Sequence, residues 1–450
     1  MAGKRSPVWT QSWFCIGISD TGIDTIPRKD GINLNQVLRH HAETIISASI
    51  QAVLPDAAVK RTLEKRCFSD RVILVAAGKA AWQMSKAACE VLGDTLHSGV
   101  CVTKYGHVMG ELPHVTCYEA GHPVPDSGSV RGTQAALDAV AGLNERDTVL
   151  FLLSGGGSAL FEKPLISVEE LQNITAQLLA SGANITEINI IRKRLSAVKG
   201  GRFALACGKA KVLAIVLSDI LGDPLDMIAS GPVCPDSSTC AQAQAIAKKY
   251  RLRLSAKAKT CLAIETPKHL SNVETEINGS VRELCSSAAA AAETLGYKSL
   301  VLTDQLCCLA KEAGSFLAAM ARTHADSGTK LAFIAGGETV VQLTGKGMGG
   351  RNQELALAAA PGISGLDNVC VFSVGSDGTD GPTDAAGGYV DGDTEAQLHR
   401  SGKAVYEILS NNDAYHGLQA TGGLIFTGPT GTNVNDIAVV LIDRKTCAIK

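Results

Sequence analysis

The sequence has almost no net charge and no long apolar run. Its 42 basic and 44 acidic side chains give a formal net charge of −2 at pH 7. A near-neutral chain argues against a dominant surface for nucleic acid or for anionic lipid. The longest apolar runs have the length of a strand, so we predict no transmembrane helix and no membrane partner. What remains is a chain of 450 residues, 45% of them hydrophobic, which is long enough for more than one globular domain.

Sequence patterns that bind metal through cysteine or histidine are also missing. The 14 cysteines are scattered, with no C-x-x-C pair, and neither a His-x-x-x-His pair nor a serine–histidine–aspartate set stands out. Zinc centres and triad hydrolases are therefore not predicted. We expect reduced thiols that pack as small hydrophobic side chains, which is typical of a cytoplasmic protein.

The first 33 residues differ from the rest of the chain. Lys4 and Arg5 precede an apolar patch that is short for a signal peptide, and Asp20 and Asp24 are unusual in a mitochondrial transit peptide. We predict a poorly ordered leader over residues 1–33 and a cytoplasmic location, and we leave delivery to mitochondria open.

Apolar runs of strand length alternate with helical segments from residue 34 onward. Residues 35–54 have the period of an amphipathic helix, and the runs at 72–77, 149–153 and 212–217 each end in a turn containing glycine or serine. Runs that are apolar on both faces are typical of parallel strands covered by helices. We therefore predict an α/β protein with a doubly wound parallel sheet in its N-terminal part.

A break after Pro232 and Pro235 indicates a second domain. We place residues 34–265 in the N-terminal domain and residues 266–450 in a smaller C-terminal α/β domain. The strands predicted after residue 266 are closely spaced, which favours a mixed sheet with some antiparallel pairs. They cover residues 273–278, 299–303, 331–335, 339–343, 369–374, 423–427 and 436–442.

Polar turns rich in glycine follow the predicted strands, which is where ligands bind in open α/β sheets. Ser154-Gly155-Gly156-Gly157-Ser158 follows one buried strand and can present free amides to a phosphate or carboxylate. The alternative is a tight turn needed only for packing. Lys79 follows another strand and supplies a point charge, unless it is an ordinary surface lysine.

Acidic and arginine-bearing turns follow other strands. Asp219 and Asp377 can each hold Mg²⁺ or orient a hydroxyl group, or can simply cap a turn. The loop at 345–350 matches G-x-G-x-x-G between a strand and a helix, but Asp377 lies far beyond it for the usual ribose-binding acid. The alternative is a glycine loop, with Gly349 and Gly350, that delivers Arg351 to a phosphate.

A last polar turn, at residues 427–436, places Thr430 and Asn433 where they can contact an anion or a substrate carboxylate. Together the turns indicate a pocket for a heavily anionic ligand. A phosphoryl-transfer site needs mainly cations, metal-binding acids and accurate positioning, which matches this set of residues.

Several stretches resemble the class II glycerate 2-kinases that carry a C-terminal MOFRL domain. They are LSGGGSAL, NIIRKRLSAVKGGRFA, SDILGDPLDMIASGP, GGETVVQLTGKGMGGRNQELAL, SVGSDGTDGPTDAAG and TGPTGTNVNDI. The resemblance covers about residues 35–443, and the sequence looks like an animal member of that family.

The resemblance implies transfer of the ATP γ-phosphoryl group to the 2-hydroxyl of D-glycerate, with Mg²⁺. It implies a Rossmann-like N-terminal domain, a smaller C-terminal MOFRL domain and an active site in the cleft between them. Active-site positions of the family match Lys79, Asp219, Glu338, Arg351, Asp377 and Asn433. Glu338 rests on the resemblance alone, whereas physical reasoning had already singled out the others.

These residues lead to a mechanistic hypothesis with alternatives. Lys79 and Arg351 would neutralise the transferred phosphoryl group and hold the carboxylate, and Asp219 or Asp377 would orient the hydroxyl or hold Mg²⁺. One alternative is an NAD(P)-dependent hydroxypyruvate reductase that uses the loop at 345–350, and another is a non-catalytic module for phosphorylated metabolites. The predicted partners are small molecules, ATP and D-glycerate, without nucleic acid, bound by a monomer or homodimer.

Overall fold

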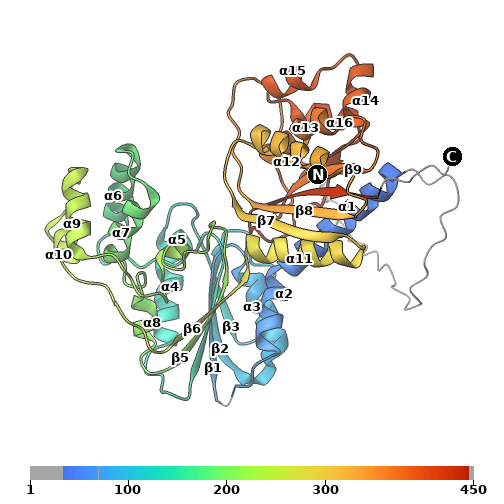
Figure 1. Ribbon diagram of the computed structural model, residues 1–450. Helices are drawn as coiled ribbons and strands as arrows, with labels where there is room; N and C mark the ends of the chain where they lie inside the picture. The colour runs from blue at the N-terminus through green and yellow to red at the C-terminus, as the bar shows by residue number, and fades with distance from the viewer. Residues whose placement is uncertain (1–33, 69, 445–450) are drawn as a thin grey trace, which may run out of the picture. The chain divides into compact units, whose positions relative to one another are not determined.

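The computed structural model describes residues 34–68 and 70–444, which fold around two six-stranded sheets (Figure 1). The leader predicted over residues 1–33 lies outside the described residues. None of the helices in the described part of the chain has the length and apolarity needed to cross a bilayer.

The first sheet is entirely parallel, with the strand order β3-β2-β1-β4-β5-β6. Chain order reverses between β1 and β4, which is the topology of a Rossmann-like doubly wound domain and the usual place for a ligand. The predicted fold class is therefore confirmed for this part. The strands are β1 Val72–Ala77, β2 Leu96–Lys104, β3 Val115–Ala120, β4 Thr148–Leu153, β5 Lys211–Leu217 and β6 Val273–Gly279.

Helices cover both faces of the first sheet because its central strands are apolar on both sides. In β1, Ile73 and Val75 face one hydrophobic cluster, while Leu74 and Ala76 face another. α4, α5 and α8 contribute to the first cluster, and α2 and α3 to the second. The bounds are α2 Pro55–Leu63, α3 Ala81–Leu92, α4 Ser127–Ala139, α5 Gly157–Leu160 and α8 Arg202–Ala206, with 3-10 turns η1 Gly93–Thr95 and η2 Ile228–Ser230.

Helices inserted after β4 and β5 form an apolar cluster of their own, drawn in green in Figure 1. Ile174, Leu178 and Ile191 are among its buried members. The helices are α6 Val168–Ala180, α7 Ile185–Leu195, α9 Cys240–Lys249 and α10 Ala256–Leu262.

The second sheet is mixed, with the strand order β11-β10-β9-β12-β8-β7. β7 and β8 are parallel, and the other neighbours pair in antiparallel fashion. The predicted mixed α/β sheet is confirmed. The strands are β7 Lys298–Leu306, β8 Leu331–Gly337, β9 Val369–Gly375, β10 Gly387–Asp391, β11 Leu424–Ile425 and β12 Asp436–Ile442.

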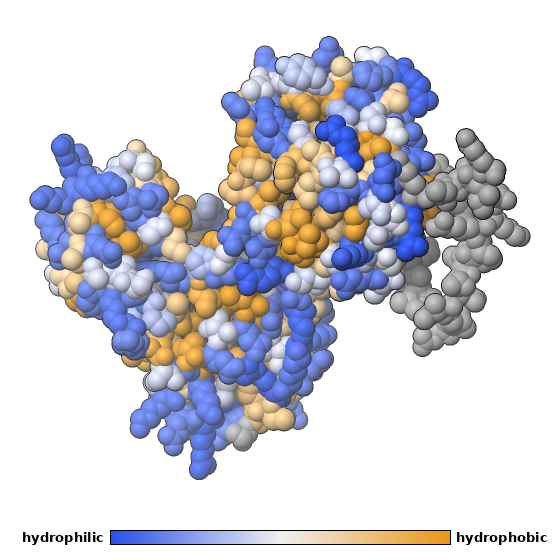
Figure 2. Space-filling model, viewed as in Figure 1, coloured by the Kyte–Doolittle hydropathy of each residue, from blue (hydrophilic) through white to orange (hydrophobic). Residues whose placement is uncertain are grey.

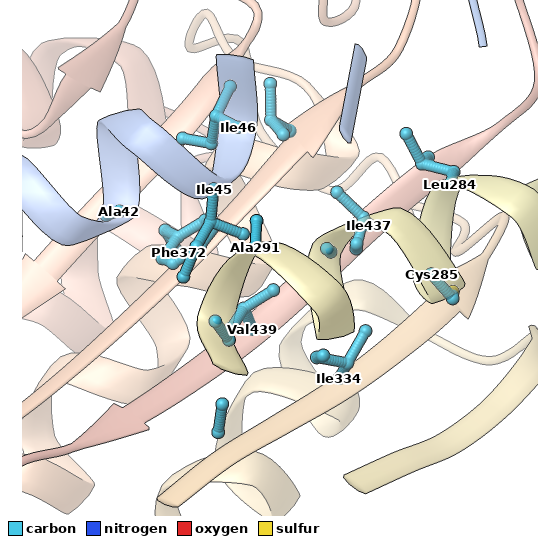
Figure 3. Packing of buried hydrophobic residues seen from close by; sticks show 14 of the residues in the cluster. Ala42, Ile45, Ile46, Leu284, Cys285, Ala291, Ile334, Phe372, Ile437 and Val439 are labelled. Atoms are coloured by element: carbon cyan, nitrogen blue, oxygen red, sulfur yellow. The ribbon is translucent and has the colours of Figure 1, made fainter. Parts of the chain in front are cut away.

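The second sheet is also covered on both faces. Figure 3 shows Ile45 and Ala291 packed against Phe372 and Val439 of the sheet. Burial of each large side chain of this kind stabilises the fold by about 1.5–3 kcal/mol. α1 and α11 lie on this face, and α12, α13 and three short helices on the other. Their bounds are α1 Leu34–Ala52, α11 Val281–Thr294, α12 Ala310–His324, α13 Arg351–Ile363, α14 Thr394–Arg400, α15 Val405–Ser410 and α16 Ala414–Ala420.

Apolar side chains also lie at the surface. Figure 2 shows them in the region of β7 and α12, where Leu300 and Phe316 are exposed. β7 is an edge strand, so its outer side has no neighbouring strand in the described part of the chain.

The sheet boundary differs from the predicted domain boundary at residue 266. β6 pairs with β5 and therefore belongs to the first sheet. α1 precedes the first sheet in sequence but packs on the second. We therefore propose that the C-terminal domain begins after Gly279 and includes α1.

Two further strand assignments differ from the prediction. The strand expected at 339–343 is absent, and Val340 forms only an isolated bridge with Leu309. The reason is that β12 and β7 already occupy both edges of β8. β10 was not predicted, because Gly387 and Gly388 weaken its strand signal.

Candidate functional site

A pocket of about 730 Å³ lies where β1, β4 and β5 end, and it gathers residues from both sheets. Its walls are mainly polar turns that follow strands, as expected for the carboxyl edge of an open α/β sheet. The lining residues that had been singled out in the sequence are Lys79, Ser154, Gly155, Asp219, Asp377 and Asn433.

The turns after β1 and β4 are bonded to each other. The amide of Lys79 donates to the carbonyl of Gly155 at 2.9 Å, and the amide of Ala80 donates to Ser154 Oγ at 3.1 Å. Gly78 has φ +130°, and a Cβ on this residue would overlap Ser154. Only glycine therefore allows the two turns to approach so closely. This contact places Lys79 directly beside the glycine-rich turn.

The glycine-rich turn offers a ligand its free backbone amides and does not offer the N-terminus of a long helix. α5 is only the short segment Gly157–Leu160. The amides of Gly155 and Gly156 donate no hydrogen bond to any described residue. A Cβ on Gly155 would overlap the carboxylate of Asp219, so this glycine is needed for the close approach. These free amides suit an oxyanion.

The rest of the turn points elsewhere. Gly156 lies against Lys79 and His122 without lining the pocket. The carbonyl of Ser158 accepts hydrogen bonds from Arg192 at 2.7 Å and Lys199 at 2.9 Å. Gly157 and Ser158 are thus anchored behind the pocket wall and do not line it.

Asp219 is the acidic group of this pocket on the first sheet. Burial raises the pKa of its carboxyl; the positive charge of Lys79 opposes this rise, and the negative charge of Glu338 adds to it. Asn435 Nδ2 donates to the carbonyl of Asp219 at 3.2 Å and to Glu338 Oε2 at 3.2 Å. A partly buried carboxylate next to a lysine is a suitable general base.

Asp377 is the acidic group on the second sheet. Its carboxylate accepts hydrogen bonds from the amide and the hydroxyl of Thr379, at 2.9 and 3.2 Å. Thr430 does not line the pocket; its hydroxyl donates to the carbonyl of Ser376 at 2.6 Å and so positions the turn that carries Asn433. Asn433 itself lines the pocket.

Arg351 lies beside the pocket and is held by carboxylates. Its Nε and Nη2 donate to Asp436 at 2.5 and 3.1 Å, and its Nη1 donates to Glu338 at 3.0 Å. Burial would lower the pKa of Arg351, but these acids reverse the effect and raise it. Neither Arg351 nor Glu338 lines the pocket. Glu338 and Asn435 connect Arg351 to Asp219, so the predicted groups lie in one network.

The amides of the loop at 345–350 already donate to the segment at 411–413. The amides of Thr344 and Gly345 donate to Asn412 Oδ1 at 2.7 and 2.8 Å. At the start of α13 the carboxylate of Asp380 accepts from the amides of Asn352 and Gln353. Gly349 and Gly350 pack against Ala414 and Asp380 instead of lining the pocket. A helix N-terminus filled by the chain's own carboxylate does not favour a dinucleotide pyrophosphate there.

The pocket has a donor set that suits Mg²⁺. Among the described residues, no group of three or more His, Cys, Asp and Glu side chains could hold a metal ion. Asp219 and Asp377 nevertheless both line the pocket. Magnesium in phosphoryl-transfer sites is commonly held by one or two carboxylates together with substrate phosphates. The residues present therefore fit this ion.

Sequence reasoning missed several residues of the site. Lys104, the last residue of β2, and His107, in the turn after it, line the pocket, and Gln83 lines it from α3. The signal was available, because a polar turn after a parallel strand was the criterion used for Lys79 and Asp219. Asp436, the partner of Arg351, gave no signal, since it lies far from Arg351 in sequence.

Comparison with known proteins identifies the family. Two family descriptions match: "Domain of unknown function (DUF4147)" over residues 41–263 and "MOFRL family" over residues 331–436. The D-glycerate 2-kinase of Thermotoga maritima is 53% identical, over 90% of this chain and 98% of that protein. A protein of Agrobacterium vitis, provisionally named a hydroxypyruvate reductase, is 37% identical over 91% of this chain and 95% of its own length.

Similarity extends to an animal protein and to a solved structure. The human glycerate kinase is 33% identical over 91% of this chain and 94% of its own length, which makes it less similar than the Thermotoga protein. The crystal structure of the glycerate kinase from Thermotoga maritima superposes with a TM-score of 0.87, at 53% identity, covering 91% of this chain and 100% of that chain. The predicted resemblance is thereby confirmed: the chain belongs to the glycerate 2-kinase family that carries a MOFRL region.

Proposed function

We propose that this chain transfers the γ-phosphoryl group of ATP to the 2-hydroxyl of D-glycerate, giving 2-phospho-D-glycerate and ADP. The observation that carries the proposal is its 53% identity to D-glycerate 2-kinase over nearly the whole of that protein. The pocket supports it, because Lys79, Asp219 and Asp377 meet there beside free backbone amides.

Phosphoryl transfer depends mainly on positioning and on electrostatic stabilisation of the transferred group. In our proposal Lys79 and the amide of Gly155 hold its negatively charged oxygen atoms. Asp219 accepts the proton of the attacking hydroxyl. Its raised pKa makes it a stronger base than an ordinary aspartate.

The acids of the pocket also account for the metal. Asp377 would hold Mg²⁺, which supplies positive charge to the phosphate oxygen atoms when bound, and Asp219 then stays available as the base. Asn433 and the turn around Thr430 would fix the second substrate from the side of the second sheet.

Arg351 needs a change of partner before it can contact a substrate. Asp436 holds two guanidinium nitrogens, whereas Glu338 holds only Nη1 and has 46% of its side chain exposed. We propose that Arg351 keeps Asp436 and exchanges Glu338 for a phosphoryl oxygen when both substrates are bound. The Asp436 contact would then set the direction of the guanidinium.

The test is an ADP-release assay coupled to NADH oxidation, run over short hydroxy acids and followed by identification of the phosphorylated position. We expect turnover with D-glycerate, and a loss of about 10²- to 10³-fold in kcat for Lys79→Met. Lys346→Met, an exposed lysine outside the pocket, is the matched control. ADP release that does not depend on glycerate, or full activity of Lys79→Met, would refute the proposal.

A reductase is the second candidate, because the 37% identical Agrobacterium protein is provisionally named a hydroxypyruvate reductase. A reductase is disfavoured because the amides of the loop at 345–350 and of the start of α13 already donate to other segments of the chain. Loss of nicotinamide absorbance with hydroxypyruvate, in the absence of ATP, would favour it. A non-catalytic binding module would show neither activity.

The location and the oligomeric state also stay proposals. We propose a cytoplasmic protein, since the cysteines among the described residues are all free thiols. A monomer or homodimer remains our expectation, and light scattering would distinguish them.

A further inference from the structure

Three neighbouring strands of the first sheet each end in a cationic or titratable group. Lys79 follows β1, Lys104 ends β2, and His122 follows β3. Parallel neighbours bring their carboxyl ends to one edge of a sheet. Lys104 and His107 line the same pocket as Lys79.

The turn after β2 is fastened to the turn after β1. His107 Nδ1 lies 3.0 Å from the carbonyl of Lys79, and Thr103 Oγ1 donates to the same carbonyl at 3.3 Å. Since a carbonyl can only accept, His107 carries a proton on Nδ1 here. Glu119 shapes the turn by accepting the amides of Gly106 and Val108 at 2.8 and 3.2 Å. His107 is therefore held at a defined place in the pocket wall.

The lysines in this wall lack a carboxylate within ion-pair distance among the described residues, although the charge of Lys79 acts on Asp219 in the same pocket. Neither Lys79 nor Lys104 forms an ion pair with any described residue. The pKa of His122 is lowered by burial and by the charges of Lys79, Lys104 and His107. These groups are thus close enough to repel one another. Such repulsion costs folding free energy, and a bound anion would relieve it.

Lysines outside the pocket are in a different situation. On α3, Lys86 Nζ lies 3.9 Å from Glu90, and on α2, Lys60 Nζ lies 2.7 Å from the same carboxylate. The first sheet therefore pairs its surface lysines with acids, whereas in the pocket wall neither Lys79 nor Lys104 forms an ion pair with a described residue.

We propose that Lys104 and His107 form, together with Lys79, an anion-binding subsite for oxygen atoms of a substrate. His122 lies beside this subsite, because a Cβ on Gly156 would contact both His122 and Lys79. The substrate identities rest on the proposed function, but the subsite itself does not. A carboxylate of the hydroxy acid and a phosphate of the nucleotide share this chemistry. Asp219 and Asp377, which line the same pocket, repel a bare anion and so direct it toward the cations.

Steady-state kinetics of Lys104→Met tests the subsite and identifies which substrate supplies the bound anion. Loss of a charge-assisted hydrogen bond predicts a rise of about 10- to 100-fold in KM for one substrate, with a much smaller change in kcat. A rise for D-glycerate assigns the carboxylate, and a rise for ATP assigns a phosphate. Lys86→Met is the matched control and should behave as the unchanged protein. Unchanged KM values for both substrates would overturn the subsite.

A binding experiment gives a readout that does not need turnover. The pKa of His122 is followed by NMR while D-glycerate, a non-hydrolysable ATP analogue or inorganic phosphate is added separately. A bound anion stabilises the imidazolium, so the pKa of His122 should rise. A His122→Gln variant assigns the signal.

The two proposals can fail separately. If no glycerate-dependent ADP release is found but phosphate raises the pKa of His122, the subsite stands and the proposed function fails. If turnover with D-glycerate is found but none of the three anions moves the pKa of His122, the subsite is wrong and the proposed function stands.

Discussion

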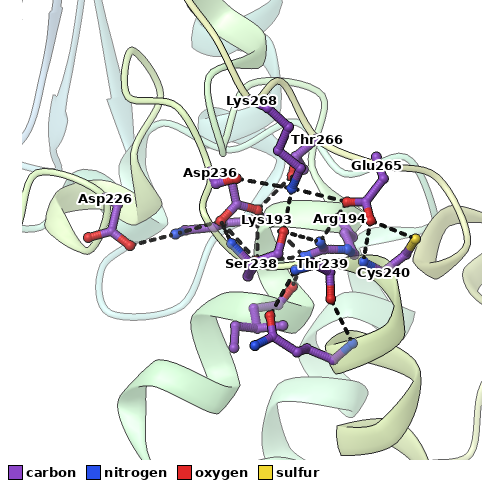
Figure 4. Close-up of polar contacts among 12 residues, drawn as sticks. Lys193, Arg194, Asp226, Asp236, Ser238, Thr239, Cys240, Glu265, Thr266 and Lys268 are labelled. Atoms are coloured by element: carbon purple, nitrogen blue, oxygen red, sulfur yellow. Dashed lines mark hydrogen bonds and ion pairs between the residues drawn. The ribbon is translucent and has the colours of Figure 1, made fainter.

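Two clusters of charged residues in this protein are built on opposite principles. One is a buried network around Asp236, where every positive charge has a carboxylate partner (Figure 4). The other is the pocket wall around Lys79 and Lys104, where neither lysine has an ion pair with a described residue. Both clusters belong to the part of the chain that carries the first sheet. The residue types alone therefore do not tell the structural cluster from the pocket wall.

The buried network joins α7 to the segments that follow it. Lys193 Nζ lies 3.1 Å from Asp226 and 3.2 Å from Asp236, whose side chain is fully buried. Arg194 Nη1 lies 3.5 Å from Asp236, and its Nη2 lies 3.2 Å from Glu265. Hydrogen bonds from Ser238 and Thr266 complete the shell around Asp236.

The difference between these clusters teaches how to interpret charge in a fold. Removing a charge from water is costly, so a buried charge must be matched inside the protein. Charge that stays unmatched next to a cavity can be matched by a ligand, and this is what we propose for the pocket wall. Compensation therefore indicates structure, and its absence beside a pocket indicates binding.

The sharpest test of this comparison is Asp236→Ala. It leaves Lys193 and Arg194 buried without their shared partner, and we expect a loss of about 3–5 kcal/mol in the free energy of unfolding. Urea unfolding measures it. Asp226→Ala is the control, because the Asp226 side chain is 36% exposed, and it should cost about 1 kcal/mol or less. Equal unfolding midpoints for the two variants would remove the distinction between the clusters.

The same network predicts a dependence on acid. Burial would raise the pKa of Asp236, but the hydrogen bond from Thr266, the charge of Lys193 and the bonds from Ser238 outweigh burial and lower it. Its stabilising effect is therefore present above the pKa of an unfolded aspartate, about 3.9, and is lost as the pH falls through the lower folded value. The difference in unfolding free energy between the original protein and Asp236→Ala should therefore decrease as the pH falls from about 3.9 through the pKa of Asp236 in the folded protein.

Asp219→Asn should separate function from stability. Burial raises the pKa of Asp219, so the ionised form is disfavoured in the folded state and lowers stability at neutral pH. The variant should lose about 10²-fold or more in kcat and yet unfold at a higher urea concentration at pH 7. This gain should vanish as the pH falls below the pKa of an unfolded aspartate. A destabilised variant at pH 7 would mean that Asp219 serves the fold.

The smallest effect is expected at an exposed pair, which gives the baseline for both clusters. Glu43 pairs with Arg39 at 2.9 Å on α1, and its side chain is 58% exposed. Arg39 also donates to the carbonyl of Leu424 at 3.1 Å and lies over the ring of Tyr389. Glu43→Gln should therefore cost about 0.5 kcal/mol or less in urea unfolding. A larger loss of unfolding free energy would show that an exposed ion pair is not a suitable baseline for the two clusters.

Part of the site was predictable because position along a strand is a local property. Lys79, Asp219 and Asp377 were found by one criterion, a polar residue directly after a buried strand, and all three line the pocket. Lys104 and His107 lie at and just after the end of β2, whose serine and glycine interrupt the apolar run. They were missed because that strand was not recognised.

Other residues were not predictable by any local rule. Arg351 was expected to reach a phosphate, yet Asp436 and Glu338 hold it. α1 was expected with the first sheet, yet its apolar face, including Ile45, packs against Phe372 of the second. Both outcomes depend on partners that are distant in sequence.

The sequence by itself determined most of the strands, the glycine-rich turns and the kind of chemistry, because hydrophobic period and turn composition act over a few residues. Only the tertiary structure decided which charges are paired and which face the pocket. The reason is that the free energy of a charge depends on its burial and on its neighbours in space, and the chain brings those neighbours from both sheets.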